Sequence, residues 1–139
     1  MLRFLLTPAL AGSLFLQSAG AQQFIQIPLP DAWAMDVTSD GSVIVGTADN
    51  ITTAPKSFLW RWETEATPTL IPGGKAAGVS DDGSVLVGTI TDPVTGIQEA
   101  ARWTQATGWV GIGSLATCDY IASTGWDISG DGTKIVGLS

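Results

Sequence analysis

Carboxylates are the reactive side chains that recur in a pattern along this sequence. Three aspartates precede a glycine in similar segments, as Asp40-Gly41, Asp82-Gly83 and Asp131-Gly132. Two of these segments carry another aspartate four residues earlier, Asp36 and Asp127, so oxygen-ligand calcium binding has to be considered. Gly78 stands at that place in the remaining segment, and a calcium site needs about six to eight oxygens.

A turn explains the same residues better than a metal site does. Asp-Gly between two β-prone runs is a strong hairpin signal, because both residues tolerate positive φ. We therefore predict a two-residue turn in which Gly83 takes positive φ, and we predict no metal site and no cofactor. The structural turn residues are then Asp40, Gly41, Asp82, Gly83, Asp131 and Gly132.

Composition removes several kinds of catalysis. The chain has no His, which excludes Ser-His-Asp and Cys-His pairs and His-ligated zinc. Its 13 acidic and 6 basic residues give a net charge of −7, which argues against nucleic acid as a partner. Glu63 and Glu99 lie near Arg61 and Arg102, but the sequence does not place them across a cleft as a glycosidase requires. No catalytic residue is predicted.

The six tryptophans could stack on sugars or pack in a core. Trp62 and Trp103 each follow an arginine at matching places, so packing between repeats explains them best. We expect each of these arginines, Arg61 and Arg102, to pair with an acidic residue of its own unit or the next. The candidate ligand contacts are the tryptophans without such a counterpart, Trp60, Trp109 and Trp126.

These residues belong to a repeated unit of about 42 residues. In each copy, a Ser or Thr precedes the Asp-Gly pair, and an apolar segment that ends at a glycine follows it. A third strand holds the Arg-Trp pair, at residues 57–62 and 98–103, and a weaker fourth strand follows. The units cover approximately residues 32–72, 73–115 and 116–139, with the last unit truncated after its second strand.

The repeats predict an all-β fold. Four strands in about 42 residues match one blade of a β-propeller, so the chain would supply about two and a half blades. A β-solenoid is the alternative packing. One such unit cannot bury its own faces, so we expect the rest of a longer chain, or other copies, to complete the fold. Residues 24–28 could supply one further strand.

Residues 1–21 have the pattern of a secretory signal peptide, which leaves a β-repeat domain at residues 22–139. Arg3 is followed by an apolar stretch, and Ala19 and Ala21 place small residues before a cleavage site. The stretch is shorter than the roughly 20 residues that span a bilayer. We expect an exported protein, periplasmic, cell-surface or extracellular, with no integral membrane segment in the mature chain.

Cys118 is the single cysteine, so it cannot form a disulfide within this sequence. In an oxidising compartment, we expect it to pair either between chains or with a cysteine outside this sequence. The alternative is a small buried thiol that serves packing.

The repeated segments resemble the HAF-family extracellular repeats of bacteria. The matching stretches are Val79 to Gly88, Ala100 to Trp103, and Gly108 to Leu115. Residues 59–62 depart from the family's Ala-Phe-Arg-Trp and keep only Arg and Trp. The family consists of secreted or cell-surface proteins expected to be propeller-like, without an established activity. The resemblance therefore implies a location and an architecture but no chemistry.

We expect a secreted or cell-surface repeat module with a non-catalytic binding or structural role. Varied loops on a repeated frame are where such proteins carry recognition, and the expected ligand is a carbohydrate or a protein. The alternative is the N-terminal part of a secreted, carboxylate-based hydrolase with a propeller fold.

The leader gives the first testable prediction. Signal peptidase should cut after Ala21, because small residues occupy the two positions that it reads. N-terminal sequencing of exported protein should begin at Gln22. Exported protein that still begins at Met1 would contradict the signal-peptide interpretation.

Overall fold

The structure is a computed structural model, and it describes residues 24–48, 56–114 and 122–139. It is all-β, as the sequence predicts. The predicted signal peptide and Cys118 lie outside the described residues. Among the residues described, no helix has the length and apolar character needed to cross a membrane. The strands are β1 (Ala32–Val37), β2 (Ile44–Ala48), β3 (Lys56–Trp60), β4 (Thr69–Pro72), β5 (Lys75–Val79), β6 (Val85–Thr91), β7 (Gln98–Thr104), β8 (Gly108–Gly113), β9 (Thr124–Ile128) and β10 (Ile135–Leu138).

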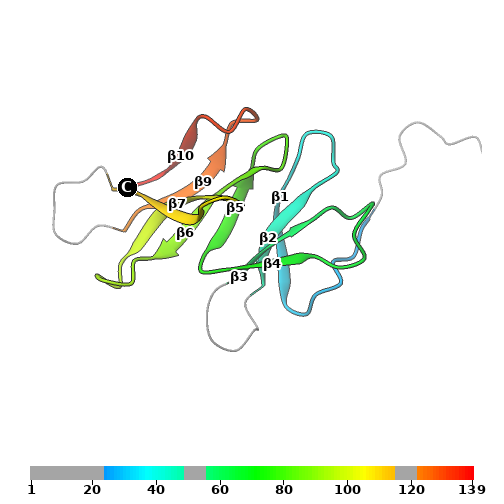
Figure 1. Cartoon of the computed structure of the whole chain (residues 1–139), viewed down its shortest axis with the longest axis horizontal. Coiled ribbons are helices and arrows are strands. Elements are labelled where there is room, and N and C mark those ends of the chain that lie inside the picture. The colour runs from blue at the N-terminus through cyan, green and yellow to red at the C-terminus, as the bar shows by residue number, and fades with distance from the viewer. Residues whose placement is uncertain (1–23, 49–55, 115–121) are drawn as a thin grey trace, which may run out of the picture.

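The described strands form three antiparallel sheets (Figure 1). Sheet 1 contains β1 to β4 and sheet 2 contains β5 to β8, each in sequence order. Sheet 3 contains β9 and β10. Strand β5 contacts β1, β2 and β3, and β9 contacts β5, β6 and β7. Consecutive sheets therefore pack face against face along the chain.

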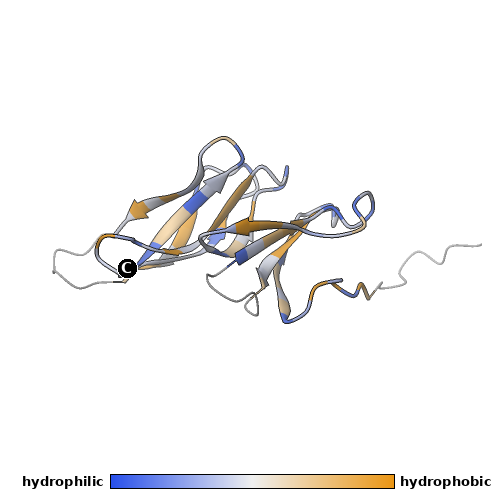
Figure 2. Cartoon of the chain, turned by 60° about the horizontal axis from the view of Figure 1, so that its bottom comes forward, coloured by the Kyte–Doolittle hydropathy of each residue, from blue (hydrophilic) through white to orange (hydrophobic). Residues whose placement is uncertain are grey.

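Sheet 2 is buried on both faces. Leu86 of β6 is fully buried in a cluster that includes Val45 and Leu59 of sheet 1. Its neighbour Val87 points the other way and packs with Ile128 of sheet 3. The apolar run of β6 predicts a strand covered on both sides, and this prediction is confirmed. In Figure 2, the hydrophobic residues concentrate along the strands.

Each sheet has a β-bulge between its first two strands, and a glycine lies beside it. In sheet 2, the register shifts between Ala76 and Gly78, and Ala76 pairs with Gly88. A Cβ on Gly88 would overlap the backbone carbonyl oxygen of Lys75. The glycines that end the other two repeated segments would meet the same obstacle, Gly46 against the Trp33 carbonyl and Gly137 against the Thr124 carbonyl.

Hydrogen bonds join neighbouring sheets near their first strands. The Val79 N–H of sheet 2 donates to Asp36 Oδ2 of sheet 1 at 2.9 Å. The other oxygen of Asp36 accepts the Val37 N–H at 2.8 Å, so one carboxylate binds backbone in both sheets. Between sheets 2 and 3, the Asp81 N–H donates to the Gly130 carbonyl oxygen at 2.9 Å.

A buried serine makes a further connection between sheets 1 and 2. The Ser57 hydroxyl of β3 donates to the Gly74 carbonyl oxygen at 2.8 Å and accepts the Ala76 N–H at 2.8 Å. Ser57 is fully buried, and both of its partners are backbone groups. The side chain thus satisfies polar groups that would otherwise be buried without partners.

Strand boundaries depart from the prediction in a few places. Strand β3 ends at Trp60 rather than at residue 62, and β7 runs on to Thr104. Residues 24–31 contain no strand, so the further strand predicted at 24–28 is absent from this chain's own sheets. Strands β9 and β10 occupy the predicted first two strands of the third unit.

The register of the third strands corrects the sequence alignment. Ile44 of β2 pairs with Trp60, whereas Leu86, at the same place in β6, pairs with Trp103. Trp103 therefore occupies the position of Trp60. The prediction that Trp62 and Trp103 recur in register is wrong, because the two strands differ by two residues in their pairing.

The close contact at the bulge can be tested with Gly88→Ala. The added methyl group would meet backbone rather than a movable side chain, so the free energy of unfolding should fall by about 1–3 kcal/mol. Urea denaturation followed by circular dichroism measures this change. Thr91→Ala, at the exposed end of the same strand, is the control and should have little effect. Equal stability of Gly88→Ala and the unmodified chain would disprove the contact.

Candidate functional site

One set of hydrogen bonds builds each Asp-Gly turn. In the second turn, Ser80 Oγ donates to Asp82 Oδ1 at 2.7 Å, and the Ser84 N–H donates to the same oxygen at 2.9 Å. The Val85 N–H donates to Ser80 Oγ at 3.0 Å. The Gly83 N–H donates to the Ser80 carbonyl oxygen at 2.8 Å. The Asp82 carboxylate and the Ser80 hydroxyl together hold the loop closed.

The other two turns have the same bonds. The Thr38 hydroxyl donates to Asp40 at 2.6 Å, and the Ser129 hydroxyl donates to Asp131 at 2.5 Å. The following glycines have φ of 75°, 67° and 69°, at Gly41, Gly83 and Gly132. The positive φ expected of Gly83 is therefore observed.

The loop is longer than the two-residue turn that the sequence predicts. The Ser80 N–H donates to the Val85 carbonyl oxygen at 3.0 Å, so four residues lie between the pair that closes the hairpin. The carboxylate of Asp82 turns inward to bind backbone and hydroxyl groups, which is how an aspartate stabilises a wider loop.

These bonds keep the turn carboxylates charged. The Ser80 hydroxyl, followed by backbone N–H donation, lowers the pKa of Asp82 to about 2. The pKa of Asp40 is also about 2, and the Thr38 hydroxyl is the largest cause. The pKa of Asp131 is lowered as well, first by the Ser129 hydroxyl. Within the described residues, no three His, Cys, Asp or Glu side chains are grouped to hold a metal ion.

A cleft of about 850 Å³ lies between sheets 1 and 2. One side is formed by the ends of β3 and β4, and the other by the second turn and the β7–β8 hairpin. The charged, hydroxyl-bearing and indole side chains among its lining residues include Arg61, Glu65, Asp82, Ser84, Arg102, Trp103 and Thr104. A smaller hollow of about 260 Å³ shares Arg61 and Asp82 with it. The cleft therefore combines charged, hydroxyl and aromatic residues.

The two arginines are not equivalent. Arg61 forms an ion pair with Glu65, with 3.5 Å between Nη1 and Oε1, as expected for an arginine that pairs within its own unit. Arg102 has no acidic partner among the described residues, so the expected second ion pair is absent there. The strand register explains this difference. Val45 pairs with Leu59 in sheet 1, whereas the equivalent Val87 pairs with Arg102 in sheet 2. Arg102 therefore occupies the position of Leu59 and not that of Arg61.

The candidate tryptophans have different environments. Trp60 is only 6% exposed, and its indole N–H donates to the Glu65 carbonyl oxygen at 2.8 Å. Trp109 pairs with Trp103 across β7 and β8, and its ring covers Gly74 so closely that a Cβ there would overlap it. Trp126 is 58% exposed and has the most surface for a ligand. The three side chains do not converge on one site.

Two further tryptophans alter the interpretation of the repeats. Trp62 lies beyond β3, and its indole N–H donates to the Gly41 carbonyl oxygen at 2.7 Å, so it supports the first turn. Trp103, interpreted from sequence as packing alone, also lines the cleft. Only the strand pairing distinguishes the role of Trp62, which supports a turn, from that of Trp103, which lines the cleft.

Glu99 is engaged within its own sheet. The Gly113 N–H donates to Glu99 Oε1 at 2.6 Å. The carboxylate also lies against Gly111, where a Cβ would overlap it. Glu63 is exposed and lines the smaller hollow between sheets 1 and 2. The structure thus gives Glu99 a structural contact rather than the position of a catalytic acid.

The turn carboxylates predict an acid dependence of stability. Because the folded pKa of Asp82 lies below its ordinary value of 3.8, its contribution is present above pH 4 and is lost as the pH falls toward 2. Asp82→Asn should therefore reduce the slope of stability against pH in this range. The control is Thr91→Ala, an exposed substitution that removes no carboxylate and should leave the slope unchanged. Identical slopes for Asp82→Asn and the unmodified chain in urea denaturation would refute the role of the carboxylate.

Comparison of the chain with protein-family models, with curated proteins and with solved structures gives no match. The cleft, the turns and the stacked sheets are therefore the features of the molecule that bear on its function.

Proposed function

We propose that this chain is an exported repeat module that binds a carbohydrate without catalysis, and that its sheets are propeller-like blades. The stacking of two four-stranded meanders supports the architecture, since blades of a propeller are such sheets. The signal-peptide pattern of residues 1–21 and the resemblance to HAF-family repeats support export.

The cleft between sheets 1 and 2 is the observation that carries the binding proposal. It places Trp103, Arg61, Glu65 and the hydroxyls of Ser84 and Thr104 around one hollow. An aromatic surface beside charged and hydroxyl groups suits a sugar, whose faces are apolar and whose edges carry hydroxyls. The Arg61–Glu65 pair is partly exposed, so it can exchange hydrogen bonds with a ligand.

A non-catalytic role fits three of the described carboxylates, which are bound into the fold. Asp40 and Asp82 are bound into the turns, and Glu99 is bound to its own sheet. A glycosidase needs two carboxyl groups facing each other across the scissile bond, with one of them available as an acid. The hydrolase alternative would need such a pair outside this set of residues.

Binding to a panel of neutral and acidic oligosaccharides tests the proposal. Calorimetry or tryptophan fluorescence should detect binding, and Arg61→Ala should weaken it roughly tenfold by removing charged hydrogen bonds. The fold should survive, because a partly exposed ion pair contributes little stability. Lys134→Ala, in the third turn and away from the cleft, is the matched control.

Three outcomes would overturn the proposal. The first is that no oligosaccharide of the panel binds. The second is that Arg61→Ala and Lys134→Ala bind equally well. The third is release of shorter sugars during incubation, which would favour the hydrolase alternative instead.

A further inference from the structure

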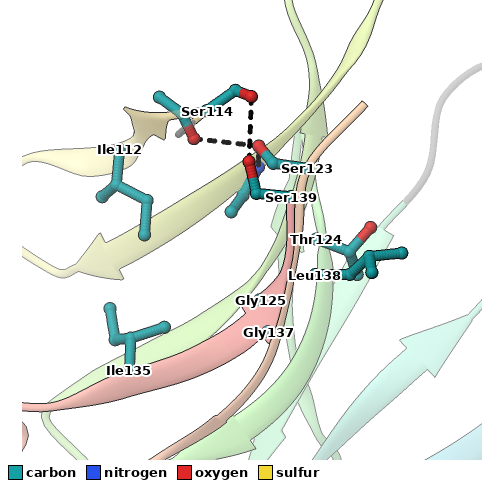
Figure 3. Close-up of a pocket in the computed structure, with 11 residues that line it drawn as sticks. Ile112, Ser114, Ser123, Thr124, Gly125, Ile135, Gly137, Leu138 and Ser139 are labelled. Atoms are coloured by element: carbon teal, nitrogen blue, oxygen red, sulfur yellow. Dashed lines mark hydrogen bonds between the residues drawn. The ribbon is translucent and has the colours of Figure 1, made fainter. Parts of the chain in front are cut away.

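Charged side chains distinguish the cleft between sheets 1 and 2 from the groove of about 500 Å³ drawn in Figure 3. The side chains that line that groove are apolar or carry hydroxyls, and the Ser123 hydroxyl there donates to the Gly113 carbonyl oxygen at 2.9 Å. The charged residues that line the cleft are two arginines and two carboxylates, Arg61, Arg102, Glu65 and Asp82. The pairing of these groups with one another decides which charge the cleft can accept from a ligand.

The Asp82 carboxylate is already bonded within its own turn. Its Oδ1 accepts the Ser80 hydroxyl at 2.7 Å and the Ser84 N–H at 2.9 Å. Its Oδ2 accepts the Ser84 hydroxyl at 2.8 Å. Three donors therefore stabilise its charge, and the described arginines form no ion pair with it. Asp82 thus leaves the arginines of the cleft available to other anions.

Among the described residues, Glu65 is the carboxylate that reaches the Arg61 guanidinium. Glu65 Oε1 lies 3.5 Å from Arg61 Nη1, whereas a charged hydrogen bond measures about 2.7–2.9 Å. Both side chains are partly exposed, 48% for Arg61 and 31% for Glu65. A guanidinium carries five N–H donors in a planar fork that fits a carboxylate. This loose contact therefore uses only part of what Arg61 can offer to an anion.

Backbone bonds hold Glu65 beside Arg61 whether or not the two charges meet. The Trp60 indole N–H donates to the Glu65 carbonyl oxygen at 2.8 Å, and the Glu65 N–H donates to the Arg61 carbonyl oxygen at 2.8 Å. The loop between β3 and β4 therefore does not depend on the ion pair. The Glu65 side chain can turn away from the guanidinium while its backbone stays in place, so another carboxylate can take its position.

We propose that the cleft selects oligosaccharides that carry carboxylates, as uronic acids do, and that Glu65 is an internal competitor for Arg61. This inference rests on the proposed carbohydrate-binding function. The ligand carboxylate bonds the planar guanidinium through two parallel hydrogen bonds, and the sugar ring lies against Trp103. Glu65 gives up its contact when the ligand enters. The hydroxyls of a neutral sugar carry no charge with which to displace Glu65, so the competition favours acidic sugars.

Matched pairs of sugars test the selectivity. The probes are oligomers of galacturonate, glucuronate and mannuronate, and the same oligomers with their carboxyl groups converted to methyl esters. Calorimetry should show that at least one acidic oligomer binds about tenfold or more tightly than its ester, because esterification removes the charge that Arg61 recognises. Added salt should weaken binding of the acid and leave binding of the ester unchanged, since salt screens a partly exposed charge pair.

Glu65→Gln tests the competition. Glutamine keeps an oxygen that can accept the Arg61 backbone N–H but carries no charge, so affinity for the acidic oligomer should rise about fivefold while affinity for its ester stays the same. Glu63→Gln removes the same charge from the same loop without removing the ion pair to Arg61, so it is the matched control. Arg61→Ala should abolish the preference for the acid. Circular dichroism confirms that each variant is folded.

Failure of the selectivity and failure of carbohydrate binding give different results. Esters that bind as tightly as the acids would overturn the selectivity and leave carbohydrate binding intact. Unchanged affinity of Glu65→Gln for the acid would do the same, as would an equal rise for Glu63→Gln, which would indicate an effect of net charge alone. If no oligomer binds in either form, both the selectivity and the carbohydrate-binding function are overturned.

Discussion

Burial of one sheet against the next is the interaction on which the rest of this structure depends. Strand β6 has apolar residues on both faces, and Leu86 and Val87 lose all contact with water only because sheets 1 and 3 cover opposite sides. Apolar burial contributes roughly 25 cal/mol per Å², so a sheet exposed on one face forfeits much of its stabilisation. Val136, at the equivalent position of sheet 3, is 61% exposed among the described residues.

Glycine permits close approaches of the backbone within the sheets and, at one position, between them. Gly46, Gly88 and Gly137 sit where a carbonyl oxygen of the bulged strand occupies the space of a side chain. Gly74 lies beneath the ring of Trp109, and Gly125 lies against Val87 in the same way. Gly125 of sheet 3 thus makes room for Val87 of sheet 2, while the other glycines permit close contacts within a sheet or beside it, so a glycine-rich chain can still form a dense core.

The all-β class, the turns and the buried second strands were predictable because each depends on residues close in sequence. Ser80, Asp82 and Gly83 form their loop with one another, so their pattern alone indicates it. The register of β7 on β6 was not predictable, because the sequence pattern does not show which residues of the two strands pair. The cleft was missed because Arg61 and Trp103 meet there only after sheets 1 and 2 have stacked.

Ser57 and Ser123 form comparable bridges from opposite sides of their interfaces. Ser57 belongs to the earlier sheet and reaches forward to Gly74 and Ala76, whereas Ser123 precedes β9 and reaches back to Ala100 and Gly113. In both places a buried serine hydroxyl donates to one backbone carbonyl and accepts one backbone N–H, although the serine stands at a different place in the repeat. A pair of exchanges, serine lost on one strand and gained on the facing one, would preserve the interface. An alignment of the repeats would then show two amino-acid differences that look unrelated, although together they move one serine hydroxyl from a strand to the strand that faces it.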